Sequence, residues 1–112
     1  MNKAAKAAIK ELRELPLEQQ RLESLKRESK KTVEDQQRLE AAIADQRDKI
    51  ALIENTLSIL SPIEQRILKS SYIRKTESIA DIMISTNYSD AQINRIKYIA
   101  LKKYAYARGF DI

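Results

Sequence analysis

The sequence predicts an all-α fold, with a long N-terminal coiled-coil helix followed by a C-terminal trihelical domain. Twelve positions at alternating spacings of three and four residues run from residue 22 to residue 60, and eight of them are Leu or Ile, with Ser29, Thr32, Gln36 and Gln46 at the others. No Gly or Pro lies between residues 17 and 60. Two capping boxes, "SPIE" at residues 61–64 and "SDAQ" at residues 89–92, mark helix starts in the second half. We therefore expect two parts, residues 1–60 and residues 61–112.

The first element is a short helix in "AAKAAIKELREL", residues 4–15. Ala5, Ala8, Ile9 and Leu12 share one face of this helix. Pro16 follows, and proline lacks the backbone N–H that a helix interior needs. We expect the helix to end or kink there.

The second element is one long helix from residue 17 to residue 60, whose apolar stripe is the seam of a coiled coil. A lone helix cannot bury such a stripe, so the pattern predicts self-association, most simply a homodimer. An alternative is a helical hairpin that folds back near residues 29–35, although no turn residue favours it. The predicted oligomerisation residues are Leu22, Leu25, Leu39, Ile43, Ile50, Ile53 and Leu57.

Composition excludes several kinds of site. The chain has no Cys and no His, so disulfides, thiolate metal sites and His acid–base catalysis are absent, and the single Gly109 excludes a glycine-rich phosphate loop. The acidic residues of the long helix alternate with Lys and Arg, which is typical of a solvated helix face. We expect no enzyme, cofactor or metal, and with no membrane span or signal peptide, a cytoplasmic protein.

The second half carries most of the positive charge. Residues 61–112 contain nine Lys or Arg against five Asp or Glu, within a net charge of +5 for the chain. A basic excess confined to one part of a chain favours an anionic partner for that part, although an ordinary soluble surface is compatible with it.

Three short helices are predicted in this half. Ser61 begins the first, Thr76 is the candidate cap of the second, and Ser89 begins the third, which Gly109 follows. The expected inward-facing residues are Ile63, Ile67, Leu68, Tyr72, Ile79, Ala80, Ile82, Met83, Ile93, Ile96, Ala100, Leu101 and Tyr104.

The last helix has the side chains of a DNA recognition helix on its outer face. Gln, Asn and Arg pair with adenine or guanine edges in the major groove, and a helix N-terminus attracts phosphate. The alternative from periodicity alone is a small helical domain with a polar surface. The expected outward residues are Asp90, Gln92, Asn94, Arg95 and Lys97.

A stretch from "LSILSPIEQRIL" through "TESIADIM" to "YSDAQINRIKYIALKKY" resembles region 4 of bacterial sigma factors, a helix-turn-helix that reads a promoter element. With a coiled coil ahead of it, the chain is similar to small sigma-region-4-like regulators of phages and prophages, the ArpU and RinA kind of late-gene activator. The match covers about half of the chain. The residues in step are Leu60, Ser61, Glu64, Arg66, Tyr72, Thr76, Ile79, Ala80, Ser89, Ile93, Ile96, Ala100, Leu101 and Lys103.

The resemblance implies a transcriptional regulator that binds double-stranded DNA in the cytoplasm of a bacterial host, with RNA polymerase as a further partner. The predicted coiled coil would make this regulator a dimer. Arg95 and Gln92 are the best candidates for base contacts. The turn between residues 80 and 89 is about three residues longer than the family's and lacks its glycine, so either the preceding helix extends to Ser85 or the turn is wider. The predicted DNA-binding residues are Arg74, Lys75, Ser89, Asp90, Gln92, Asn94, Arg95, Lys97 and Lys102.

Two other functions stay open. A small terminase subunit also joins a helix-turn-helix to an oligomerising helical part, and would recognise a DNA packaging site instead of a promoter. A protein adaptor would use Tyr98, Ile99 and Tyr106 to bind a partner without DNA. Activation and repression are not distinguished by these residues.

Overall fold

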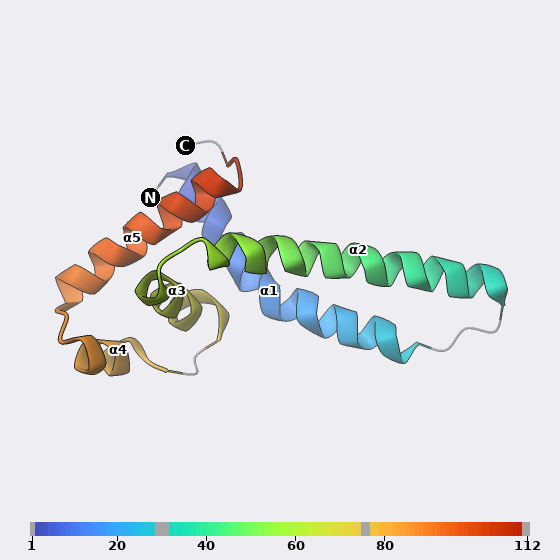
Figure 1. Ribbon diagram of the computed structural model, residues 1–112, viewed down its shortest axis with the longest axis horizontal. Helices are drawn as coiled ribbons and strands as arrows, with labels where there is room; N and C mark the ends of the chain where they lie inside the picture. The colour runs from blue at the N-terminus through green and yellow to red at the C-terminus, as the bar shows by residue number, and fades with distance from the viewer. Residues whose placement is uncertain (1, 29–31, 75–76, 111–112) are drawn as a thin grey trace.

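The two longest helices, α1 (Lys3–Arg27) and α2 (Val33–Ser58), lie side by side and run in opposite directions (Figure 1). The computed structural model describes residues 2–28, 32–74 and 77–110. These residues form α-helices and one π-helical turn, with no strand among them. Half of the hairpin projects away from the remaining helices, which gather around its other end (Figure 1). Nowhere in the described residues is a helix long and apolar enough to cross a membrane.

The expectation of one unbroken helix over residues 17–60 is wrong, and the hairpin alternative is confirmed. Helix α1 runs through Pro16 and ends at Arg27, and α2 begins only at Val33. The Thr32 hydroxyl caps α2, because its oxygen accepts a hydrogen bond from the Asp35 backbone N–H at 3.0 Å. Thr32 therefore marks the start of a second helix.

The stripe that predicted a partner helix is buried within the chain. Leu39, Ile50, Ile53 and Leu57 are buried, and Leu22, Leu25 and Ile43 are partly buried. The stripe is divided between α1, which carries Leu22 and Leu25, and α2, which carries the other residues, and the two helices pack on each other. A second copy is therefore not needed to bury the stripe, and the dimer stays a prediction that this burial no longer supports.

A buried glutamine links the two helices of the hairpin. Gln46 on α2 is 2% exposed, and its Nε2 donates to the Glu18 carbonyl oxygen on α1 at 2.9 Å and also to the Glu18 carboxylate. A buried amide requires such partners, so this pair favours one alignment of α1 against α2.

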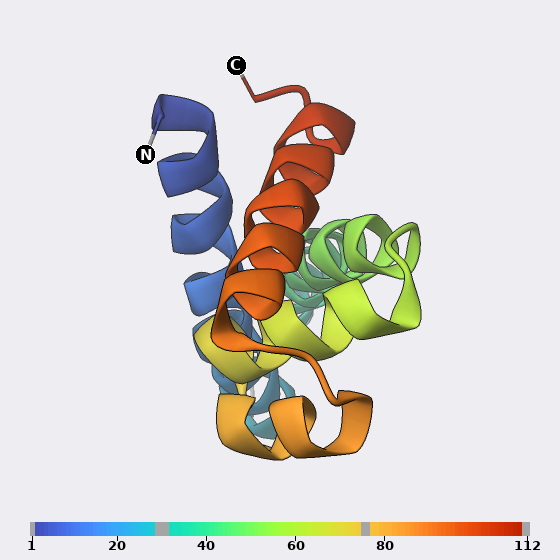
Figure 2. The same ribbon diagram turned by 90° about the vertical axis from the view of Figure 1, so that its left-hand side faces the viewer.

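The larger apolar cluster joins the hairpin to the last helix, α5 (Asp90–Ala107). Figure 2 shows α1 and α5 side by side, and small residues on both helices permit their close contact. The predicted boundary at residue 61 lies in the connection after α2, and this cluster extends across it. Its buried members are Ala4, Ala8, Leu12, Leu15, Ile50, Ile53, Leu57, Leu60, Leu68, Ala100, Leu101, Tyr104 and Ala105.

The smaller cluster lies between α3 (Pro62–Leu68), α4 (Ile79–Thr86) and the first half of α5. Ile67, Ile82 and Ile93 form its buried centre, one from each helix. The predicted capping boxes Ser61/Glu64 and Ser89/Gln92 are both confirmed. The predicted cap Thr76 lies outside the described residues, and α4 is instead capped by Ser78 with Asp81.

A π-helical turn, η1 (Lys69–Ile73), extends α3 and was not predicted. The Arg74 backbone N–H donates to the Lys69 carbonyl oxygen at 2.9 Å, which closes a turn one residue wider than that of an α-helix. The chain leaves η1 in an extended conformation and then enters α4.

Candidate nucleic-acid interface

A three-residue turn connects α4 to α5. The sequence left two arrangements open, a preceding helix that extends to Ser85 or a wider turn. The structure has the first, with α4 ending one residue later, at Thr86. Asn87 follows with φ 60°, in the left-handed region that glycine adopts most easily and that Asn tolerates. Asn87 therefore allows a tight turn at this point without a glycine.

The start of α5 is fixed by its capping box. The Gln92 backbone N–H donates to the Ser89 hydroxyl at 3.3 Å, and the Ser89 backbone N–H donates to the Gln92 side-chain oxygen at 2.8 Å. Both predicted site residues thus already serve the helix start. The Gln92 side-chain nitrogen has no acceptor in the described parts of the chain, whereas its oxygen would have to leave Ser89 to read an adenine.

Asp90, Asn94 and Arg95 lie exposed on the first two turns of α5. Asn94 and Arg95 have no hydrogen-bond or ion-pair partner within the described parts of the chain. Seven residues beyond Arg95, Lys102 lies on the same face, two helical turns further along. Its Nζ stands 5.5 Å from the centre of the Tyr98 ring, which is also exposed.

Lys97 and Arg74 are not part of this face. Lys97 is partly buried and lines a hollow with residues of η1 and the start of α4. Arg74 lies beside Leu15 and Gln19 of α1, on the hairpin side of α3. Lys75 lies outside the described residues. Five predicted residues, Ser89, Asp90, Gln92, Asn94 and Arg95, are thus brought together at one end of α5, with Lys102 further along.

Glu77, which sequence reasoning missed, pairs with Arg66, and through Arg66 the helix α3 contacts both ends of α4. Arg66 Nε donates to Glu77 Oε1 at 2.9 Å, and Arg66 Nη2 donates to Glu77 Oε2 at 3.0 Å and to Ser85 Oγ at 2.9 Å. The hydrogen bonds between these two side chains lower the pKa of Glu77 and raise the pKa of Arg66. The Ser70 hydroxyl also donates to the Glu77 carbonyl oxygen at 2.7 Å. These contacts set the position of α4 and so of the turn that leads to α5.

A second set of polar contacts holds the far half of α5 on α1. Tyr104 is fully buried, and its Oη donates to Glu11 Oε1 at 2.7 Å. Arg108 Nε donates to the same oxygen at 2.6 Å, and Arg108 Nη2 donates to Glu11 Oε2 at 3.2 Å. Burial, together with the hydrogen bond to Glu11, raises the pKa of Tyr104 far above its usual value. Tyr104 therefore stays a neutral donor at any ordinary pH.

Glu64 and Lys103, two of the residues on which the sequence resemblance rests, form an ion pair. Lys103 Nζ lies 3.0 Å from Glu64 Oε2, and Glu64 is 5% exposed. Burial raises the pKa of Glu64, but hydrogen bonds from Ser61 and the Lys103 ammonium outweigh it and lower the pKa overall. This pair ties the start of α3 to α5.

Comparison of the chain with protein-family models, with curated proteins and with solved structures finds no match.

Proposed function

We propose that the protein is a sequence-specific DNA-binding transcriptional regulator that inserts the first half of α5 into the major groove of DNA. One observation carries the proposal. Asn94 and Arg95 stand exposed and unpaired among the described residues, at the start of a capped helix that a three-residue turn joins to α4. This order, with the second helix presenting its N-terminal residues, is that of a DNA-reading helix-turn-helix.

The side chains suit base edges. An arginine donates two hydrogen bonds to guanine, and an asparagine pairs with adenine in the same bidentate manner. Asp90 accepts hydrogen bonds only and repels phosphate, so it fits the amino group of a cytosine. Lys102, two turns beyond Arg95, is the candidate for a phosphate contact.

The hairpin acts as a support for α5 in this proposal. The larger cluster holds the far half of α5 on α1, and the smaller cluster holds the half that carries Arg95 on α3 and α4. Two copies on one operator remain part of the proposal, and the stoichiometry of the complex on DNA measures this directly.

The test begins with selection of preferred duplexes from a random pool, followed by fluorescence anisotropy across a salt series. Arg95→Ala should weaken binding to the selected duplex about tenfold or more, because a bidentate base contact contributes about 1–3 kcal/mol of discrimination. Arg38→Ala is the matched control, since Arg38 is equally exposed but lies on α2. Arg38→Ala should weaken DNA binding less than about twofold, through a small electrostatic effect that is the same for every duplex.

The salt dependence identifies the kind of contact. Binding should weaken steeply as salt rises, because each phosphate contact releases counterions. Absence of binding at low salt, or equal losses for Arg95→Ala and Arg38→Ala, would contradict the proposal.

A second candidate function is protein docking, which the far end of the same face favours. Tyr98, Ile99 and Tyr106 are 45%, 42% and 78% exposed, which is unusual for a row of large apolar side chains. Tyr106 lies eleven residues beyond Arg95, about 16 Å along the helix, and so beyond the reach of bases that Arg95 contacts. RNA polymerase is the partner that the sequence resemblance implies.

Tyr106→Ser separates docking from DNA binding. We expect purified bacterial RNA polymerase to bind the wild-type chain and to lose that binding in Tyr106→Ser, while DNA affinity is unchanged. No binding of polymerase by the wild type would remove this candidate and leave DNA binding untouched.

A further inference from the structure

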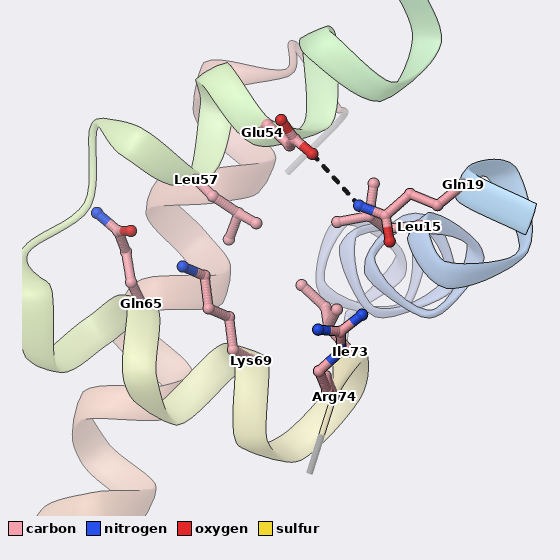
Figure 3. Close-up of a pocket in the computed structure, with 8 residues that line it drawn as sticks. All are labelled: Leu15, Gln19, Glu54, Leu57, Gln65, Lys69, Ile73 and Arg74. Atoms are coloured by element: carbon pink, nitrogen blue, oxygen red, sulfur yellow. Dashed lines mark hydrogen bonds between the residues drawn. The ribbon is translucent and has the colours of Figure 1, made fainter. Parts of the chain in front are cut away.

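A groove of about 460 Å³ lies between the hairpin and the π-helical turn, on the other side of α3 from the proposed DNA-reading face. We call it the π-turn groove. Its apolar side chains are Leu15 from α1, Leu57 from α2 and Ile73 from η1 (Figure 3). The volume lies in the usual range of small-molecule clefts, about 300–1,000 Å³.

The π-helical turn places two cations at this groove. Lys69 and Arg74 stand at the two ends of η1, joined by the hydrogen bond that closes the wide turn. Both side chains extend from the η1 ribbon toward the hairpin (Figure 3). Single π-turns are rare and occur frequently at functional sites, because the wide turn redirects side chains that a regular α-helix would place elsewhere.

The charges of the groove are unbalanced. Lys69 and Arg74 are exposed and have no ion-pair partner among the described residues. Among the described residues that line the groove, the one carboxylate is Glu54, which comes from α2 on the opposite side and accepts a hydrogen bond from Gln19 at 3.3 Å (Figure 3). The two positive charges of Lys69 and Arg74 should attract a ligand with one negative charge. The negative charge of Glu54 should repel a ligand with two.

We propose that the π-turn groove binds a small amphipathic carboxylate, whose anionic group lies between Lys69 and Arg74 and whose apolar part lies against Leu15, Leu57 and Ile73. The proposal follows from this groove alone and does not require that the protein bind DNA. Charge complementarity selects the head group, and the apolar side chains select the hydrocarbon body.

Decanoate is the probe, added to the full chain below its micellar concentration and followed through backbone amide NMR shifts. We expect saturable shifts at residues 15–19 and 69–74. Decyltrimethylammonium has the same chain length and the opposite charge, and should produce no saturable shift there. The double variant Lys69→Gln/Arg74→Gln should bind decanoate at least about tenfold more weakly, a loss of about 1.4 kcal/mol.

The matched control is Arg38→Gln/Arg47→Gln, which removes the same charge from exposed positions on α2 and should bind decanoate like the wild type. Circular dichroism checks that both double variants keep their helices. Equal shifts with decyltrimethylammonium, equal affinity in the Lys69/Arg74 variant, or no shift at the groove would each overturn the proposal. Dimerisation of the chain in sedimentation, together with failure of the dimer to bind decanoate, would also overturn the proposal.

Discussion

The first and second halves of α5 differ in what they contact and in how their polar side chains are used. From Asp90 to Ile96 the helix packs on α3 and α4 through a small cluster, and its outer side chains Asn94 and Arg95 contact no partner among the described residues. From Ala100 onward it packs on α1 through the larger cluster, and Tyr104 is hydrogen-bonded to Glu11.

This difference separates support from recognition along one helix. Polar side chains whose hydrogen bonds are all met inside the molecule stabilise the fold, whereas exposed and unpaired ones are free to bind another molecule. Substitutions of buried side chains such as Leu101 and Tyr104 should therefore lower the free energy of unfolding, and substitutions of the exposed Asn94 and Arg95 should lower only binding.

The largest effect is expected at Leu101, which is 1% exposed in the larger cluster. Leu101→Ala should lower the free energy of unfolding by about 2–5 kcal/mol, because it removes buried methyl groups and leaves a cavity. Urea denaturation measures the change. Arg95→Ala, on the exposed side of the same helix, is the control and should change stability by less than about 0.5 kcal/mol. Similar losses in the two variants would refute the division of α5.

A smaller effect is expected at Glu11, the acceptor shared by Tyr104 and Arg108. Glu11→Ala should lower the free energy of unfolding by about 1–3 kcal/mol, because it leaves the buried Tyr104 hydroxyl unsatisfied. Glu14→Ala, one turn along α1, removes a carboxylate without a hydrogen-bond partner among the described residues and should cost less than about 0.5 kcal/mol. Equal costs at the two positions would show that the Glu11 contacts do not anchor α5.

Short sequence patterns predict some features of this fold and miss others. Capping boxes at Ser61 and Ser89 were predictable, because each depends on residues three positions apart. The hairpin was not preferred, although Thr32 followed by Glu34 and Asp35 is a helix-start signal that was available. The spacing of Leu and Ile predicted that a helix covers the stripe, but not that this helix is α1 of the same chain.

The candidate interface was predicted in part for a similar reason. Exposure of Asn94 and Arg95 follows from helix periodicity and the capping signal. The positions of Arg74 and Lys97 depend on η1 and on how α3 meets the hairpin, and no short pattern in the sequence predicts a π-helical turn. Glu77 was missed because its partner Arg66 lies eleven residues away, across the junction between α3 and α4.

The smallest effect is expected from the pair of Glu64 and Lys103, which joins the second half of α5 to α3. Since the pKa of Glu64 is lower in the folded state than its ordinary value of 4.5, the carboxylate stabilises the fold above that value. This contribution should be lost as the pH falls through the lower, folded-state pKa.

Glu64→Gln keeps the capping geometry, since Gln also serves that position, and removes only the charge. Urea denaturation from neutral to acidic pH should show a smaller fall in stability for Glu64→Gln than for the wild type. Asp48→Asn, at an exposed position on α2, should leave the fall unchanged. An identical pH dependence in Glu64→Gln and wild type would mean that the ionised Glu64 carboxylate, with its contacts to Ser61 and Lys103, adds no measurable stability.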